Sequence, residues 1–177
     1  IFFKRITDTS NNVNYPNKRY KYIKNIGDGS ASVIYEAIDK INSKKVIIKK
    51  IKKNESWRNE LEMLNIIKNT TSDRILKILD YYETQRRSYI VTEYYKGFDL
   101  FSHIDINAPY TELNGILLIK EMAKCIKECH DNNVLHLDIK CENYMVKSKN
   151  LFENNKCVGK LVLIDFGHAK YSQNIEK

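Results

Sequence analysis

Residues 136–143 read His-Leu-Asp-Ile-Lys-Cys-Glu-Asn, a polar octet with a short apolar run on either side. In it an acid, Asp138, is followed two residues later by a cation, Lys140, and three residues after that by an amide, Asn143. The flanking runs, Val-Leu before the octet and Tyr-Met-Val after it, have the composition of short buried strands. The octet is therefore predicted to be a loop that a rigid frame holds in place.

A second polar segment has the same setting. Asp165-Phe166-Gly167 comes directly after residues 161–164, four apolar residues that are typical of a core strand. The two acids, Asp138 and Asp165, are therefore the first candidates for a functional site.

The bulk composition bounds the class of protein. A length of 177 residues with 42% hydrophobic content suits one globular body or two small lobes. No run of about 18 apolar residues is present, so no membrane span is expected. The sequence starts without Met and without the apolar core of a signal peptide, and we expect it to be a piece of a longer reading frame.

The cysteines indicate a reducing compartment. Cys125, Cys129, Cys141 and Cys157 contain no CxxC pair, so no disulfide framework is predicted and an intracellular, cytoplasmic location is expected. Cys125 and Cys129 lie one helical turn apart and could share a metal with His130. A reduced, partly buried pair is the favoured interpretation.

The charge is concentrated in the first half of the chain. Residues 1–92 hold 19 Lys and Arg against 10 Asp and Glu, net +9, and residues 93–177 hold 11 against 12, net −1, which sum to the total of +8. The lysines between 44 and 53 alternate with apolar residues, as in a strand with solvated ends. No nucleic-acid-binding motif accompanies them, so nucleic acid is not an expected partner.

The first half has the pattern of a β meander followed by a helix. After a polar lead-in, residues 1–19, apolar and polar residues begin to alternate. Strands separated by short turns are predicted at 20–26, 33–38 and 45–49. A helix is predicted from 55 to 68, because apolar residues recur there at spacings of three and four.

The second half begins with a hairpin and becomes helical. Two strands are predicted at 75–82 and 88–94, and helical spacing returns after Gly97. The longest helix is predicted at 113–130, and residues 151–159 are predicted to be a polar insertion. The apolar face of the long helix is predicted to consist of Ile116, Leu117, Ile119, Ala123, Ile126 and Cys129.

Taken together, the octet and the Asp165 triplet resemble the catalytic loop and the metal-binding triplet of protein kinases. A cation two residues after the acid is the serine/threonine pattern. The resemblance covers residues 20–177 and implies an α+β, bilobal, protein-kinase-like fold. Its parts are a five-stranded antiparallel N-terminal lobe with one helix, 20–92, and a hinge with an incomplete, mainly helical C-terminal lobe, 93–177.

The resemblance assigns roles to the polar side chains of both segments. Asp138 is the expected catalytic base, which orients the substrate hydroxyl and accepts its proton. Lys140 is expected to neutralise charge on the γ-phosphoryl group of ATP. Asn143 and Asp165 are the expected magnesium ligands, since Mg²⁺ takes few carboxylates when phosphate oxygens complete its shell.

The segment Gly27-Asp28-Gly29 joins two predicted strands. Alone it would more often be a hairpin turn than a phosphate loop, and a dinucleotide site is excluded because a strand, not a helix, follows it. It resembles the kinase glycine-rich loop, whose backbone amides approach phosphates where no side chain intrudes. In that alignment Ser32 stands at the third glycine and Ala31 at the aromatic tip.

Lys49 ends an apolar strand, where a lysine is usually only a solvated strand end. The resemblance assigns it to the α- and β-phosphates, bonded to a glutamate of the following helix. Glu60 and Glu62 are both candidates, and Glu60 is favoured because Leu64 lies four residues on, inward on the same face. Ile47 takes the place of the small residue that lies over adenine.

The remaining nucleotide contacts follow from the same alignment. Thr92 is expected beside the back pocket, the backbone of Glu93 and Tyr95 at the adenine edge, and Asp99 at the ribose. The alignment also places three apolar side chains at the nucleotide: Ile26, Ile34 and Met145.

Some residues depart from the family pattern. His136 is expected to pack beneath Phe166, as in the family, but Leu137 replaces an arginine that often reads an activation-loop phosphate, so such a phosphate is not the expected switch. Cys141 replaces a proline. Only ten residues follow Gly167, so the chain by itself is expected to bind ATP but to phosphorylate protein poorly or not at all.

The expected function is transfer of the γ-phosphoryl group of ATP to Ser or Thr hydroxyls of protein substrates, with ATP and Mg²⁺ as cofactors. The alternative is an ATP-binding pseudokinase or scaffold. A small-molecule kinase of related fold fits less well, because such enzymes lack this glycine loop and the Lys140 pattern.

Overall fold

The computed structural model describes residues 18–29, 32–52, 56–68, 72–148, 150–153 and 156–172. Most of the predicted lead-in and the loop-tip residue Ala31 lie outside these ranges, as does the side chain of Trp57.

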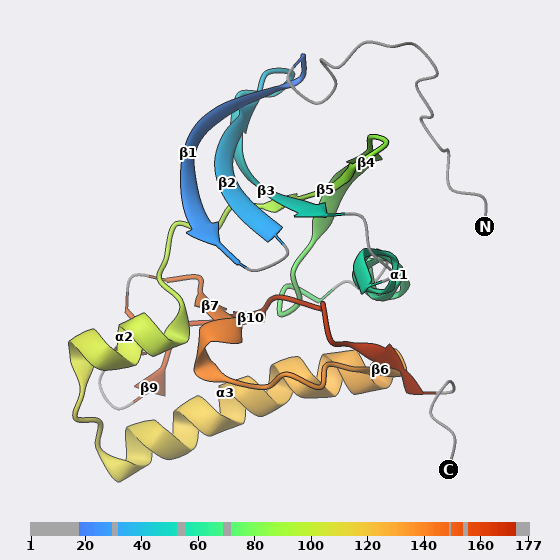
Figure 1. The fold of residues 1–177 in the computed structure, drawn as a ribbon. Helices are drawn as coiled ribbons and strands as arrows, with labels where there is room; N and C mark the ends of the chain where they lie inside the picture. The colour runs from blue at the N-terminus through green and yellow to red at the C-terminus, as the bar shows by residue number, and fades with distance from the viewer. Residues whose placement is uncertain are drawn as a thin grey trace. The chain divides into compact units, whose positions relative to one another are not determined.

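The chain divides into two compact units (Figure 1). The first consists of Ile1–Trp57 and Ile78–Tyr94, and the second of Arg58–Lys77 and Tyr95–Lys177. The change from the first unit to the second at Tyr94 lies beside the predicted hinge. Most of the helix that was expected in the N-terminal lobe belongs to the second unit, and the lobe limits 20–92 and 93–177 stay a prediction.

A five-stranded antiparallel sheet makes up the described part of the first unit, in the order β1-β2-β3-β5-β4 (Figure 1). Strand β2 pairs with both β1 and β3, β4 pairs with β5, and pairing of β3 with β5 joins the two groups; all of these pairs are antiparallel. The predicted meander and second hairpin are both present, with β3 extended beyond its predicted ends. The strands are β1 (Tyr20–Asp28), β2 (Ser32–Asp39), β3 (Lys44–Lys52), β4 (Ile78–Glu83) and β5 (Arg87–Glu93).

Alternate strand residues face opposite sides of this sheet. Val46 and Ile48 of β3 face the core of the unit. The residues between and beside them, Ile47 and Lys49, therefore lie on the other face, where the register pairs Lys49 with Ile34. The core cluster consists of Tyr20, Ala37, Val46, Ile48, Tyr82 and Val91.

Three helices belong wholly or mainly to the second unit: α1 (Ser56–Ile67), α2 (Leu100–Asn107) and α3 (Glu112–Asp131). α1 begins and ends within one residue of its predicted limits. Asp99 caps α2 by accepting a hydrogen bond from the backbone N of Ser102 at 2.8 Å, and Thr111 caps α3 by accepting one from Asn114 at 3.2 Å.

Short strands frame the polar octet. β6 (Val134–Leu135) precedes it, and the 3-10 turn η1 (Cys141–Asn143) ends it and leads into β7 (Tyr144–Val146). β7 pairs with β10 (Leu161–Leu163), and β6 pairs with β11 (Lys170–Tyr171). The prediction of a loop between buried strands is confirmed.

The predicted apolar face of α3 is wrong in part. Ile116 and Ile119 are 59% and 63% exposed, and Ala123 is exposed as well. Strands β6, β10 and β9 (Lys156–Cys157) contact α3, and the side chains that α3 buries include one carboxylate and two thiols. Of the predicted set only Cys129 is buried, while Leu117 and Ile126 are half-buried. The buried residues of α3 are Leu118, Glu121, Cys125 and Cys129.

The predicted polar insertion is also more structured than expected. Phe152–Glu153 (β8) and Lys156–Cys157 (β9) pair as a short antiparallel ladder. Leu151 is buried, and its carbonyl accepts bonds from the backbone N of Val158 and of Gly159. The insertion is therefore anchored by an apolar side chain at its start.

Candidate active site

The first residue of the octet is a buried anchor. The ring of His136 packs edge-on against Phe166, with centroids 4.9 Å apart. Its Nε2 donates to the carbonyl of Ile164 at 2.9 Å, and its Nδ1 accepts from the backbone N of Asp138 at 3.3 Å. Burial lowers the pKa of His136, so the neutral ring keeps this one tautomer. It thereby fixes the start of the loop against the Asp165 segment.

Two side chains of the octet converge on the carboxylate of a third. Asp138 Oδ2 accepts from Lys140 Nζ at 2.8 Å and from Asn143 Nδ2 at 2.9 Å. Lys140 and then Asn143 lower the pKa of Asp138, because both stabilise its ionised form. The same contact raises the pKa of Lys140. The spacing in sequence therefore corresponds to a single hydrogen-bonded cluster.

Asn143 also connects the octet to the second polar segment. Its side-chain Nδ2 donates to the backbone carbonyl of Asp138 at 2.7 Å. Its backbone carbonyl accepts a hydrogen bond from the backbone N of Ile164 at 2.8 Å. Because the amide nitrogen is directed to Asp138, the amide oxygen remains as the atom that could bind a cation.

Two residues of the site have left-handed backbone conformations. Asp165 has φ 60° and Leu137 has φ 62°. Such angles are costly for residues with a Cβ and occur where surrounding contacts impose them, often at functional sites. At Asp165 one such contact is a bond of 3.4 Å from the backbone N of Gly167 to Oδ1.

Helix α1 brings further side chains to the Asp165 segment. A Cβ placed on Gly167 would lie 3.3 Å from Asp165 Oδ1 and 3.9 Å from Glu60 Oε2, so both carboxylates border this glycine. Glu60 is buried, whereas Glu62 is exposed. Beside it, Asn59 Nδ2 donates to the carbonyl of Ala169 at 2.6 Å. These positions favour Glu60 over Glu62 as the functional helix acid.

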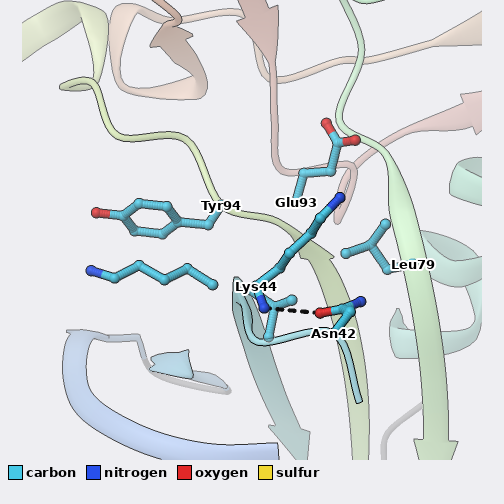
Figure 2. Close-up of a pocket in the computed structure, with 7 residues that line it drawn as sticks. Asn42, Lys44, Leu79, Glu93 and Tyr94 are labelled. Atoms are coloured by element: carbon cyan, nitrogen blue, oxygen red, sulfur yellow. Dashed lines mark hydrogen bonds between the residues drawn. The ribbon is translucent and has the colours of Figure 1, made fainter. Parts of the chain in front are cut away.

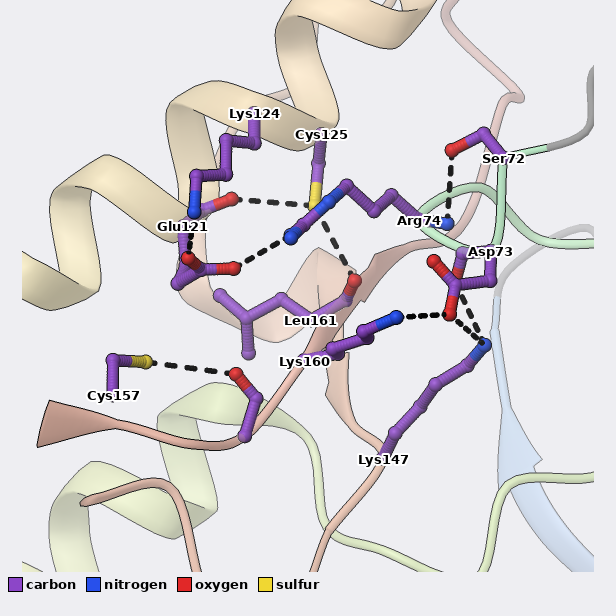
Figure 3. Close-up of polar contacts among 11 residues, drawn as sticks. Ser72, Asp73, Arg74, Glu121, Lys124, Cys125, Lys147, Cys157, Lys160 and Leu161 are labelled. Atoms are coloured by element: carbon purple, nitrogen blue, oxygen red, sulfur yellow. Dashed lines mark hydrogen bonds and ion pairs between the residues drawn. The ribbon is translucent and has the colours of Figure 1, made fainter. Parts of the chain in front are cut away.

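A polar network supports β10, the strand that leads to Asp165 (Figure 3). The backbone of Arg74 accepts a bond from Leu163 at 2.9 Å, and its side chain bonds Glu121 of α3 at 2.6 Å. On the same helix the thiol of Cys125 donates to the carbonyl of Leu161 at 3.4 Å. Burial raises the pKa of Cys125 to about 11, so this thiol stays protonated and can act as the donor.

The glycine segment lies in the first unit. Gly27 is near the end of β1, and the backbone N of Gly29 donates to the carbonyl of Ser32 at 2.8 Å. The side chain of Asn25 bonds both Gly27 N and Asp28, which fixes the bend. The neighbouring predicted contacts are Ile26, which is exposed on β1, and Ile34, which is half-buried on β2.

The other predicted nucleotide contacts lie in both units. Lys49 is half-buried on β3 and Glu93 ends β5, both in the first unit. In the second unit, Tyr95 is half-buried and Met145 lies on β7, opposite Val162 of β10. Asp99 has a structural task as the α2 cap, with both carboxylate oxygens bonded to Ser102.

The family model of the protein kinase domain matches residues 20–177 of this sequence. The chain belongs to the protein kinase family. Its kinase domain has the predicted five-stranded antiparallel sheet, three helices and part of the C-terminal lobe, so the predicted family and fold class are confirmed.

Serine/threonine kinases are among the relatives of this kinase domain. It is 29% identical over 174 residues to the probable serine/threonine-protein kinase 2 of Plasmodium falciparum, and the aligned region covers 96% of this chain and 33% of the relative. It is 32% identical over 155 residues to the serine/threonine-protein kinase DCLK1 of Rattus norvegicus, and this alignment covers 86% of the chain and 35% of the relative. The serine/threonine-protein kinase 33 of Mus musculus is 29% identical over 152 residues, covering 84% and 31%. The chain thus spans about a third of the length of these relatives.

One contact and one backbone conformation of the kinase domain were not predicted. The hydrogen bond between Asn59 and Ala169 joins residues 110 positions apart. The backbone of Leu137, between His136 and Asp138, is left-handed. An asparagine directly before Glu60 was visible in the sequence. Which backbone carbonyl it reaches depends on the tertiary fold.

The alternative metal site at Cys125, Cys129 and His130 has no support. Among the described residues, no three His, Cys, Asp or Glu side chains are grouped so that they could hold a metal ion. Both thiols are buried and His130 is exposed. None of the helices in the described ranges combines the length and the hydrophobicity that a membrane crossing needs.

Proposed function

We propose that this kinase domain transfers the γ-phosphoryl group of ATP to serine or threonine hydroxyls of protein substrates. The observation that carries the proposal is the Asp138 carboxylate, bonded at once to Lys140 and Asn143 and backed by the buried His136. This is a base whose orientation and ionisation are both fixed before a substrate arrives.

The transfer needs one proton acceptor and one charge-neutralising group. Asp138 would orient the substrate hydroxyl and accept its proton as the oxygen forms a bond to the γ-phosphorus. The bond from that phosphorus to the oxygen that bridges it to the β-phosphate breaks, and ADP leaves with the electron pair. Lys140, exposed and adjacent to Asp138, would neutralise charge on the transferred group.

The donor set of the second unit fits magnesium. Asn143 offers an amide oxygen because its nitrogen is bonded to Asp138, and Asp165 offers a carboxylate that its left-handed backbone directs. One carboxylate and one amide suit a cation that keeps waters and phosphate oxygens in its shell. When bound, magnesium would neutralise the β- and γ-phosphates.

The glycine segment of the first unit supports the nucleotide part of the proposal. No described glycine has a positive φ, and a Cβ at Gly27 or Gly29 would meet described atoms only at 3.5 Å or more. Among the described residues, the fold therefore does not explain why these positions lack side chains. Close approach of backbone amides to phosphates does explain it. We assign Lys49 to the phosphates, and Glu60 of α1 to the residues that support nucleotide binding.

Nucleotide binding is the first test. We expect the chain to bind Mg·ADP in calorimetry, and Lys49→Met and Asp165→Asn to lose most of that affinity. Glu60→Gln should weaken binding, and Glu62→Gln, its matched control on the same helix, should not. Asp138→Asn should bind like the wild type, since the base acts only in the transfer. Absence of binding by the wild type would contradict the proposal.

Phosphoryl transfer is the second test, made on the longest reading frame that contains this domain. With radiolabelled ATP, Asp138→Asn should lower the rate about 10²- to 10⁴-fold, the usual contribution of a positioned acid or base. Equal transfer rates for the wild type and Asp138→Asn would contradict the role of Asp138 as the base. Binding without transfer would favour the alternative, an ATP-binding pseudokinase or scaffold.

An intracellular location and a Ser/Thr-containing protein partner belong to the same proposal. Four cysteines without a disulfide support the first. The position of Lys140 and the similarity to serine/threonine-protein kinases support the second.

A further inference from the structure

The first unit contains a buried carboxylate that the proposed reaction does not use. Glu36 of β2 is only 4% exposed. Lys45 Nζ donates to its Oε1 at 2.5 Å, and Lys24 Nζ lies 3.6 Å from its Oε2. Lys45 lowers the pKa of Glu36, and Glu36 raises the pKa of Lys45, so both groups stay charged and joined at neutral pH. A buried carboxylate with a close cation is a fixed point on a sheet surface.

The strand register places this pair on the face that carries the proposed nucleotide residues. Glu36 is opposite Ile47, and Lys45 is two residues before it on β3. Side chains alternate between faces, so Glu36 and Lys45 share a face with Ile34 and Ile47, opposite the core residues. Glu36 and Lys45 therefore lie on the proposed adenine face, at the end where β3 begins.

The ammonium of Lys45 also holds an aromatic ring. It lies 5.0 Å from the ring centroid of Tyr94, the last residue of the first unit, directly after Glu93. Tyr94 and Glu93 border a hollow of about 320 Å³, together with Asn42, Lys44 and Leu79 (Figure 2). The half-buried ring of Tyr94 thus has open space on one side, and the contact with the Lys45 ammonium restrains its position.

We propose that Lys45, fixed by Glu36, is a positioning residue for nucleotide binding: it holds Tyr94 and so sets the adjacent backbone of Glu93 that bonds the adenine. The inference rests on the proposed function and adds a residue that determines the affinity for the adenine part of the nucleotide. Neither Glu36 nor Lys45 needs to touch the nucleotide.

The size of the effect follows from the contact. An exposed cation–π contact corresponds to about a three- to five-fold change in affinity. Lys45→Met should raise the Kd for Mg·ADP by about that factor, and Lys45→Arg, which keeps both contacts, should restore it. Tyr94→Leu should have a similar effect. The double variant Lys45→Met/Tyr94→Leu should lose no more than either single change, because both remove one interaction.

The experiment measures Mg·ADP and Mg·tripolyphosphate binding by calorimetry for each variant, together with thermal unfolding. Tripolyphosphate lacks the adenine ring, so the affinity for Mg·tripolyphosphate should not change in these variants. The matched control is Lys44→Met, which removes the same charge from the neighbouring position of β3. It should leave both affinities unchanged.

The outcomes separate this inference from the proposed function. Wild-type binding of Mg·ADP with an unchanged Kd for Lys45→Met would overturn the inference alone. An equal loss for Mg·ADP and Mg·tripolyphosphate would also overturn it, because it would indicate general distortion of the sheet. Failure of the wild type to bind Mg·ADP would overturn both.

Discussion

Asp138 is the residue on which the contacts of the catalytic loop converge. Its side chain accepts from Lys140 and Asn143, its carbonyl accepts from Asn143, and its backbone N donates to His136. Each of these bonds is local in sequence, within five positions. The octet therefore contains most of what orients its own acid.

The ionisation of Asp138 gives a testable pH dependence. Its pKa in the folded chain is below the ordinary aspartate value of about 3.9. Its contribution to stability is therefore fully present above pH ~4 and is lost as the pH falls through the lower folded pKa. Lys140→Met should move the pKa upward, which carbon-13 NMR titration of the Asp138 carboxyl would detect. An unchanged pKa in the variant would show that the Lys140 contact does not hold in solution.

Leu137 carries backbone strain at an exposed position. It is 55% exposed and left-handed, so its side chain gains little from burial while its backbone is disfavoured. Leu137→Asn should raise the free energy of unfolding by about 0.5–1 kcal/mol, because asparagine tolerates this conformation. The control is Ile139→Asn, an exposed apolar neighbour without a positive φ. A chemical denaturation midpoint that rises equally for both would attribute the gain to polarity instead.

At the scale of elements, α3 is joined to the segment before β4 by an ion pair. Glu121 is bonded by Arg74 and Lys124, and its side chain is 8% exposed. Burial by itself raises the pKa of Glu121, but these cations reverse the effect and the net pKa is lowered. Its stabilising contribution is present above the ordinary glutamate pKa of about 4.3 and is lost as the pH falls through the lower folded value.

Removal of one partner should be costly. Glu121→Gln should lower the free energy of unfolding by about 2–3 kcal/mol, somewhat less than for a fully buried pair because Arg74 keeps some contact with solvent. Asp131→Asn breaks the exposed Lys127–Asp131 pair on the same helix and should cost less than about 0.5 kcal/mol. Urea denaturation of both variants tests this, and similar costs would contradict the assigned role of Arg74.

Two glycines allow a matched comparison between close approach and open space. A Cβ at Gly97 would lie 1.8 Å from the carbonyl oxygen of Val146, whereas one at Gly115, inside α3, would meet no described atom within 4 Å. Gly97→Ala should displace β7 and destabilise the second unit severely. Gly115→Ala should stabilise the helix by about 0.5–1 kcal/mol. Thermal unfolding should therefore move in opposite directions, and a shared direction would refute the packing at Gly97.

At the scale of the molecule, a nucleotide that binds the folded chain and not the unfolded chain should stabilise the fold. At a Mg·ADP concentration of about 100 times Kd, the free energy of unfolding should rise by about 2.7 kcal/mol. A chelator should remove this gain, and Asp165→Asn should not show it. Calorimetric scans with and without nucleotide provide the measurement. A gain that survives the chelator would argue against magnesium at Asn143 and Asp165.

The sequence by itself determined the family, the order of the five strands of the large sheet with α1 and α3, and the local cluster around Asp138, because these depend on spacing along the chain. It did not determine which stripe of α3 is buried: Ile116 and Ile119 have the apolar chemistry and are exposed, yet Glu121 and Cys125 are buried. Nor could it assign Lys45 to Tyr94 or Asn59 to Ala169. Only the tertiary structure decided these, since a buried polar group is stable wherever the fold supplies its partner, and those partners are far away in sequence.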